Sequence, residues 1–228
     1  MKKIVLSIIV IALSCSSVLA QTPSEILKKY YTTTNILTVD SNEAMKMEMN
    51  IKAGGQNIGM KAIILGTKIN CDMTMMGQKM KLVTNGTKGW MTIPGQGVVE
   101  LPEDQVKAQA KQMNPLAGFS FNEENYDLTM TTDDNHFIIT AIDKKDAEAK
   151  KTPQTIYINK KTNLIDQINA ELQGLKTITK LTEYKEFDGI KMPTNISTYV
   201  DDKKMAEIII VNLETNYPAP DFLFNKPE

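Results

Sequence analysis

The sequence of 228 residues contains no arginine, one histidine, one tryptophan and two cysteines. A chain without arginine cannot hold a carboxylate or a phosphate through the bidentate fork of a guanidinium group. The formal net charge is −1, so there is no basic excess of the kind that neutralises nucleic-acid phosphates. Apolar residues make up 42% and charged residues 23%, which excludes a disordered or collagen-like chain. We therefore expect a folded protein that binds no nucleic acid.

Motifs of the common enzyme classes are also missing. The chain has no GxSxG nucleophile elbow, no HExxH zinc motif, no phosphate-binding loop and no GxGxxG fingerprint. His136 is the only histidine, so a catalytic triad or a His-rich metal site would need unusual partners. The acidic pairs Asp133-Asp134 and Asp201-Asp202 stand where hairpin tips are expected, and solvated turns account for them. We expect no catalysis, metal or cofactor, although composition alone leaves a two-carboxylate glycosidase open.

The first 20 residues have the pattern of a secretory signal peptide. Lys2 and Lys3 give it a positive start, and the apolar run over residues 4–13 is too short to span a bilayer. Small residues before position 21 predict cleavage after Ala20, export to the periplasm and a mature chain of residues 21–228. The alternative is a lipoprotein anchored through Cys15. After cleavage Cys71 is the only cysteine, which excludes an intramolecular disulfide.

Two short helices are predicted. Thr22 and Glu25 have the spacing of a capping box, and an apolar stripe follows over residues 24–31. The second helix is predicted over residues 103–113, because Val106, Ala110 and Met113 recur at helical spacing.

The remainder has the pattern of an antiparallel meander. Methionines and isoleucines alternate with polar residues over 45–51 and 69–75, which is typical of strands with one apolar face. Glycine-containing turn signals at 54–55, 66–67, 77–78, 85–86 and 95–97 divide the first half into about five strands. Seven more strands are predicted at 126–130, 136–142, 155–158, 164–170, 175–184, 192–200 and 205–213.

Methionine is the most informative residue type, because all fourteen except Met1 lie outside the predicted signal segment. Its side chain is flexible and polarizable, and it suits surfaces that accept variable apolar partners. Ordinary core filling is the alternative interpretation. The candidate ligand-binding residues of an apolar cavity are Met45, Met47, Met49, Met60, Ile69, Met73, Met75, Met80, Val106, Met113, Phe119 and Phe121.

The C-terminal third of the sequence has motifs that resemble those of a known family. Residues 183–193 read EYKEFDGIKMP, a Tyr-x3-Asp-Gly-Ile-x2-Pro turn, and a closing tail contains Asn216, Phe224 and Pro227. With the order of helix, meander, helix and meander, this pattern resembles the LolA/LolB-like family of outer-membrane lipoprotein-sorting and carrier proteins of the bacterial envelope.

The resemblance implies an α+β fold, with residues 21–228 forming one LolA-like domain. This domain would be a single, strongly curved antiparallel sheet, an open half-barrel of about eleven strands, with helices covering its concave apolar face. The family's carrier holds its lid shut through an arginine on an early strand. This chain has none, and Lys46 or Lys61 offers only a point charge, so the lid lock does not carry over.

The resulting hypothesis is a monomeric periplasmic carrier that holds lipoprotein acyl chains or other lipids and exchanges them with donor and acceptor envelope proteins. The alternative is a non-catalytic structural or protein-interaction module on the same fold, with a filled core. A fold can host several functions, so the two remain open at this point.

Overall fold

The computed structural model describes residues 21–40, 42–113, 119–145, 153–172 and 174–228. The predicted signal peptide, with Cys15, lies outside these residues. No helix within them is long and apolar enough to cross a membrane. In chain order, with η marking 3-10 helices, the elements are α1 (Pro23–Thr34), η1 (Ile36–Thr38), β1 (Ala44–Ala53), β2 (Gln56–Leu65), β3 (Lys68–Met75), β4 (Gln78–Asn85), β5 (Gly89–Ile93), β6 (Gly97–Leu101), α2 (Glu103–Met113), β7 (Tyr126–Thr132), β8 (His136–Asp143), β9 (Gln154–Asn159), β10 (Ile165–Leu172), β11 (Leu175–Phe187), β12 (Ile190–Val200), β13 (Lys203–Tyr217) and η3 (Asp221–Phe224).

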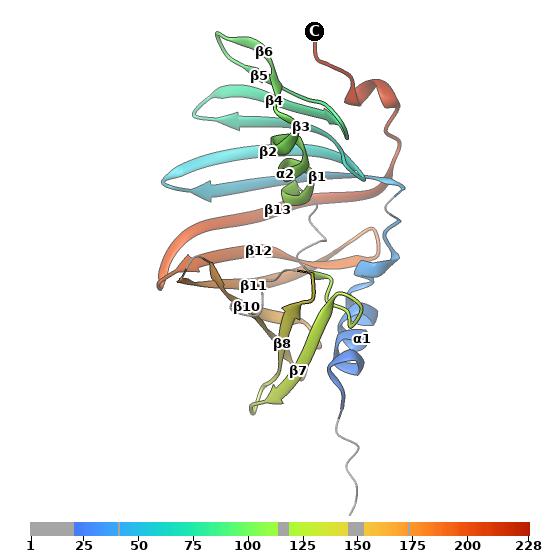
Figure 1. Ribbon diagram of the computed structural model, residues 1–228, viewed down its shortest axis with the longest axis vertical. Helices are drawn as coiled ribbons and strands as arrows, with labels where there is room; N and C mark the ends of the chain where they lie inside the picture. Colours follow the sequence, from blue (N-terminus) through green and yellow to red (C-terminus); the bar gives the residue numbers. More distant parts are fainter. Residues whose placement is uncertain (1–20, 41, 114–118, 146–152, 173) are drawn as a thin grey trace, which may run out of the picture.

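Thirteen strands form one sheet in the order β6-β5-β4-β3-β2-β1-β13-β12-β11-β10-β9-β8-β7 (Figure 1). Every neighbouring pair is antiparallel. The first and last strands of the chain, β1 and β13, lie side by side in the middle of the sheet. The outer strands β6 and β7 are not neighbours, so the sheet is open. The single antiparallel sheet is as predicted.

The predicted number of about eleven strands is wrong. The described residues form thirteen strands: the seven that the pattern of the second half indicates and six in the first half, where about five were predicted. β5 and β6 have five residues each, GWMTI and GVVEL, and neither alternates strictly between apolar and polar residues. The turn signals themselves are reliable: Gly54 and Gly55 have φ of 57° and 79°, as a tight hairpin between twisted strands requires.

Local sequence sets the bounds of α1. The Thr22 hydroxyl accepts a hydrogen bond from the Glu25 amide, and the Glu25 carboxylate accepts one from the Thr22 amide at 2.8 Å. This completes the predicted capping box. The helix ends at Asn35, whose φ of 53° is left-handed. It therefore runs one turn beyond the predicted residues 24–31, whereas α2 has the predicted bounds.

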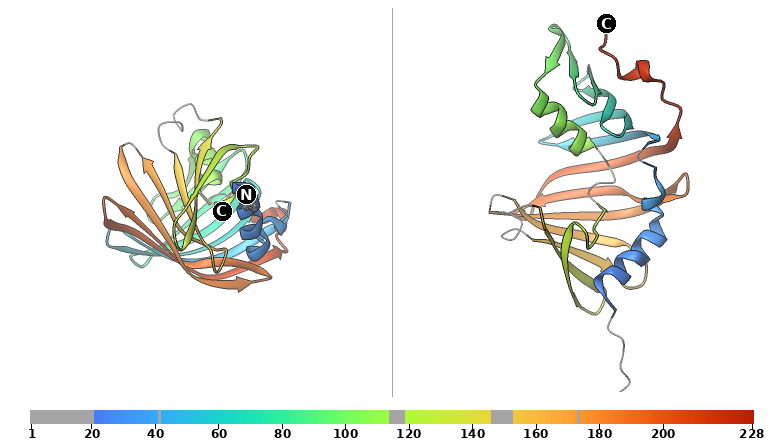
Figure 2. Two further views of the ribbon diagram at one scale, coloured as in Figure 1. Left: turned by 90° about the horizontal axis from the view of Figure 1, so that it is seen from below. Right: turned by 45° about the vertical axis from the view of Figure 1, so that its right-hand side comes forward.

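The apolar side chains form two clusters on one face of the sheet. The first cluster joins α1, through Ile26, Leu27 and Tyr30, to β8–β11. The second joins β1–β4 to β12 and β13, and α2 packs against it. A continuous cross-strand row through Ile208, Ile196 and Leu181 shows that both clusters occupy the same face. Each helix thus packs on its own half of the curved sheet (Figure 2).

The C-terminal segment covers part of the opposite face. Residues 68, 70 and 72 of β3 alternate with the apolar residues of the second cluster, so they point the other way. There the Asn70 side chain donates a hydrogen bond to the Leu223 carbonyl at 2.6 Å, and Lys68 lies 2.8 Å from Asp221. Phe224 of η3 is only 1% exposed. The tail motif therefore packs on the face of β3 and β4 that is opposite the second apolar cluster.

This docking predicts a difference between two neighbouring phenylalanines. Phe224→Ala removes a buried ring and should lower the free energy of unfolding by about 3–5 kcal/mol. Phe222→Ala, at a side chain that is 69% exposed, should change it by less than about 0.5 kcal/mol. Urea unfolding followed by circular dichroism measures both. Equal effects of the two substitutions would show that η3 does not pack on the sheet in solution.

Candidate functional site

Four methionines lie in one cross-strand row on the inner face of β1–β4. Met49 is paired with Met60, Met60 with Met73, and Met73 with Met80. All four are half-buried, and the first three pack against the second apolar cluster. We call these four residues the methionine row. Its side chains occupy directly opposed positions, where Cβ atoms of neighbouring strands lie about 4.5–5.5 Å apart.

A second row on the same face, two residues along each strand, is buried. It runs through Met47, Ala62, Cys71 and Leu82, which are all 2% exposed or less. Burial in these apolar surroundings raises the pKa of the Cys71 thiol to about 12. Cys71 is therefore a protonated, apolar core residue at neutral pH.

The third row is covered by α2. It runs through Ile64, Ile69, Thr84 and Gly89, and a Cβ on Gly89 would lie 2.8 Å from the Val106 side chain. A glycine is therefore required where the first turn of α2 meets β5. The methionine row stands four residues further along each strand, about 13 Å from this contact. The third row is buried, whereas the methionine row is half-buried.

Sequence reasoning thus grouped residues that the structure separates. The half-buried members of the predicted set are Met49, Met60, Met73, Met75, Met80 and Met113. The core members, 7% exposed or less, are Met45, Met47, Ile69, Val106, Phe119 and Phe121. Ile58 and Met91 were missed, although both lie on the same face, opposite Met75 and Leu82 respectively. Period-2 alternation in β2 would have indicated Ile58.

Phe119 and Phe121 belong to the other half of the sheet. Both are in the first cluster with α1 and β8–β11, away from the methionine row. The Tyr31 hydroxyl donates to the Phe121 carbonyl at 2.5 Å and accepts from the Phe121 amide at 2.7 Å. These bonds fasten the segment after α2 to α1. We predicted that these two rings line one cavity with the methionines. The structure places the rings in the first cluster and the methionines at the second cluster.

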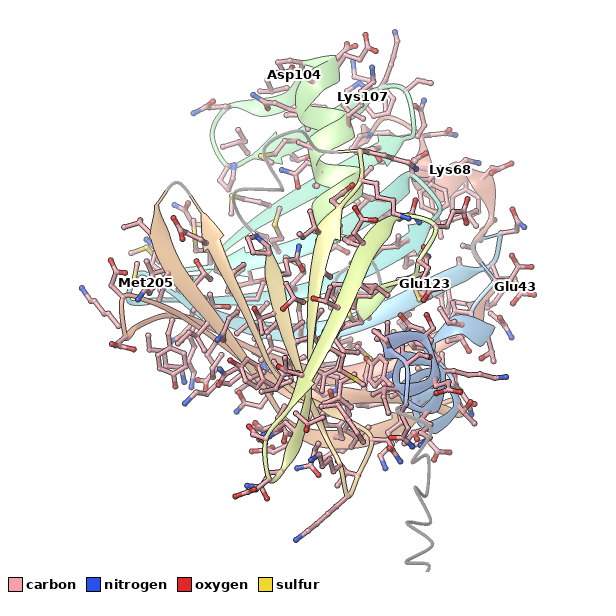
Figure 3. All side chains as sticks on the ribbon, turned by 60° about the horizontal axis from the view of Figure 1, so that its bottom comes forward. Glu43, Lys68, Asp104, Lys107, Glu123 and Met205 are labelled. Carbon is pink, nitrogen blue, oxygen red and sulfur yellow. The ribbon has the colours of Figure 1, made fainter. Side chains whose placement is uncertain are left out.

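The opposite face of β1–β4 is charged. Glu48, Lys61, Asp72 and Lys81 follow one another across the four strands, with ion pairs at 3.0 Å between Lys61 and Glu48 and 3.3 Å between Lys81 and Asp72. Lys46 donates to Glu214 at 3.0 Å, and this hydrogen bond raises its pKa. Lys46 and Lys61 therefore point away from the helices and cannot hold a lid over the inner face. Solvent-facing polar groups also cover α2, where Asp104 and Lys107 lie on its outer side (Figure 3).

His136 stands at the start of β8 between two carboxylates. Its Nδ1 lies 3.3 Å from Asp133 and its Nε2 lies 3.2 Å from Asp166, which also accepts from Asn159. These contacts tie the β7–β8 turn to β9 and β10. Among the described residues, no group of three or more His, Cys, Asp or Glu side chains is arranged to hold a metal ion.

Three surface hollows of about 470–560 Å³ lie away from the methionine row. One is formed by the β1–β2 and β12–β13 turns, near Met205 (Figure 3). The other two border the exposed side of α1, through residues such as Lys28 and Thr32. The first hollow lies at hairpin tips and the second is lined by polar residues, whereas the third also includes Leu27, Tyr31 and Phe121. Phe121 is the one residue of the predicted set that lines any of these three hollows. The methionines of the set lie on the open inner face, which we take as the candidate apolar site.

No protein-family model matches this sequence, and no curated protein matches it. Solved structures do match. A domain described as an outer membrane lipoprotein-sorting protein from Vibrio parahaemolyticus has a TM-score of 0.54 at 14% identity, over 89% of this chain and 95% of that one. A LolA superfamily protein from Nitrosomonas europaea has a TM-score of 0.54 at 12% identity, over 91% and 99%. The chain has the LolA fold.

A third structure, a DUF1329 family protein from Desulfovibrio piger, aligns with a TM-score of 0.53 at 16% identity, over 88% of this chain and 97% of that one. At such identities the shared property is the backbone arrangement, not a shared set of side chains. The LolA fold explains the order of helices and strands along the chain. The methionine row is a feature of this sequence on that fold.

Proposed function

We propose that the protein is a non-catalytic carrier of the cell envelope that binds acyl chains, of lipoproteins or other lipids, over the methionine row. The observation that carries the proposal is the row itself: four half-buried methionines on the inner face of an open sheet with the LolA fold. Half-burial matters, because a ligand that covers apolar surface still in contact with water gains free energy from the burial of that surface.

The dimensions and chemistry of the row suit an extended hydrocarbon chain. Three spacings between neighbouring strands of about 4.8 Å give a row about 14 Å long. Each methylene group that leaves water stabilises the complex by about 0.8 kcal/mol. Methionine side chains adapt to ligands of different shape, so the row is suited to chains of varied length and saturation. The absence of charged side chains from the row avoids the cost of desolvating them.

The signal pattern favours action in the periplasm, and we propose that the protein acts there as a monomer. Such a carrier would receive its cargo from one envelope protein and deliver it to another. The lid would differ from that of the family's carrier, because Lys46 and Lys61 are bound to Glu214 and Glu48 on the opposite face.

A structural or protein-interaction module is the second candidate. It is favoured by the buried half of the predicted set, since Met45, Met47 and Ile69 fill the core instead of lining a space. In that case the half-open row would be covered by a partner protein.

Lipid analysis of the purified protein tests the proposal. We expect protein isolated from the envelope to yield acyl lipids in organic extracts analysed by mass spectrometry. The delipidated protein should then bind a fluorescent fatty-acyl probe, and the extracted lipid should displace it. Protein that carries no lipid and never binds the probe would leave only the interaction module.

A further inference from the structure

The methionine row brings four thioether sulfurs to neighbouring positions on four successive strands. Met60 and Met73 are central, directly opposite each other, and Met49 and Met80 flank them. A metal–sulfur bond of about 2.3 Å places three sulfurs around one ion about 4 Å apart. Opposed Cβ atoms are about 4.5–5.5 Å apart, and each methionine has three rotatable side-chain bonds. The outer Cβ atoms of three neighbouring methionines are about 9–11 Å apart, so the outer side chains must turn toward the central one to bring three sulfurs to one ion.

The surroundings of the row select the type of ion. The two rows that flank it on β1–β4 contain apolar side chains, Cys71 and Gln78, and no charged residue. A hard divalent cation requires several carboxylate or carbonyl oxygens, and the side chains of these rows offer a single one, on Gln78. Neutral thioethers are soft ligands that select soft, weakly hydrated ions such as Cu(I).

Cys71 is not required as a ligand. Its side chain lies in the buried second row and is 0% exposed, so it is not on the open part of the inner face. Further thioethers are available instead, since Met113 of α2 and Met91 of β5 both pack against the same cluster. A site of this kind binds a monovalent ion without any change in the charge of the protein's own groups.

We infer that the methionine row is a binding site for a soft monovalent metal ion, Cu(I) or Ag(I), held by the thioether sulfurs of Met60, Met73 and one of their two neighbours in the row. The inference is independent of acyl-chain binding, because it depends on sulfur atoms and not on apolar surface. It assigns a second ligand class to the same open face.

Competition with the Cu(I) chelator bicinchoninate, under anaerobic conditions with ascorbate as reductant, measures the site. We expect the purified protein to take one equivalent of Cu(I) from the chelator. The double variant Met60→Leu/Met73→Leu should lose at least tenfold in affinity, because leucine keeps the apolar volume and removes the sulfur. Binding of Cu(I) to this variant with unchanged affinity, or no binding by the original protein, would overturn the inference.

Two control variants test whether the thioethers of the row are the ligands. Met130→Leu changes a half-buried methionine of the first cluster and should leave Cu(I) affinity unchanged. Cys71→Ala should also retain Cu(I) binding, and loss of binding in this variant alone would overturn the thioether assignment. Circular dichroism checks that each variant folds.

A redox-inert probe and the acyl probe complete the test. Ag(I) should shift the methyl resonances of the row's methionines in NMR spectra while leaving Met130 in place. Acyl binding is measured separately, with the fluorescent probe on the unchanged protein. Failure of the metal site and failure of the carrier proposal therefore give different results.

Discussion

The variant Met73→Glu is expected to fold and to lose at least tenfold in affinity for a fluorescent fatty-acyl probe. Met73 is half-buried in the centre of the methionine row, so a carboxylate there keeps contact with water in the free protein. A bound acyl chain would remove that contact, and an unpaired charge beside hydrocarbon costs several kcal/mol. The measurement is a probe titration of each protein at neutral pH.

A neighbouring residue supplies the matched control. Thr74→Glu places the same charge one residue along the chain on the opposite face, where Thr74 is exposed and paired with Lys79. We expect wild-type probe affinity from this variant. Loss of binding in both variants would show a general effect of charge on the sheet, and retention in both would place the acyl site elsewhere.

The variant Met47→Glu is expected to unfold. Met47 is 2% exposed and packs among Leu213, Ala62 and the rest of the second cluster. Burial of an unpaired charge costs several kcal/mol, which is comparable to the whole stability of a typical domain, about 5–15 kcal/mol. The loss of a cooperative thermal transition in circular dichroism would show the effect.

Met47→Leu is the control for this substitution, because it keeps the volume of the side chain and should cost less than about 1.5 kcal/mol. A glutamate variant that melts at the wild-type temperature would mean that residue 47 reaches solvent. The contrast between Met47 and Met73 thus tests the division of the predicted set into core and open-face residues.

Much of the fold follows from local patterns. Alternation identifies β1 and β3, glycine turns fix the hairpins, and the capping box fixes the start of α1. The turn within residues 183–193 has a clear role: the Asp188 carboxylate accepts from the Thr215 amide at 2.9 Å, and the Gly189 carbonyl accepts from the Asn35 side chain. That turn therefore joins β12 and β11 to β13 and to the end of α1.

The depth of each side chain could not be predicted. Alternation assigns Met47 and Met49 to the same face, but the difference in burial depends on β13 and α2, which are distant in sequence. Phe119 and Phe121 follow α2 closely in the chain, yet they pack beside Tyr31 on the other half. The face on which a side chain lies follows from the local sequence of its strand. Its burial depends on helices and strands that are distant in sequence, so the local pattern does not predict it.

The pairing of β1 with β13 has a consequence for the order of folding. These strands are the first and last along the chain, and they pair from Ala44 with Tyr217 to Ala53 with Ala206. Contacts between such distant residues make folding slow, because a long loop must close before they form. Until β13 is synthesised, the long strand β1 has an unpaired edge beside the apolar residues of β1–β4. The nascent chain is thus most prone to aggregation while its last fifteen-residue strand is still missing, and anything that protects this edge during that interval will raise the yield of folded protein.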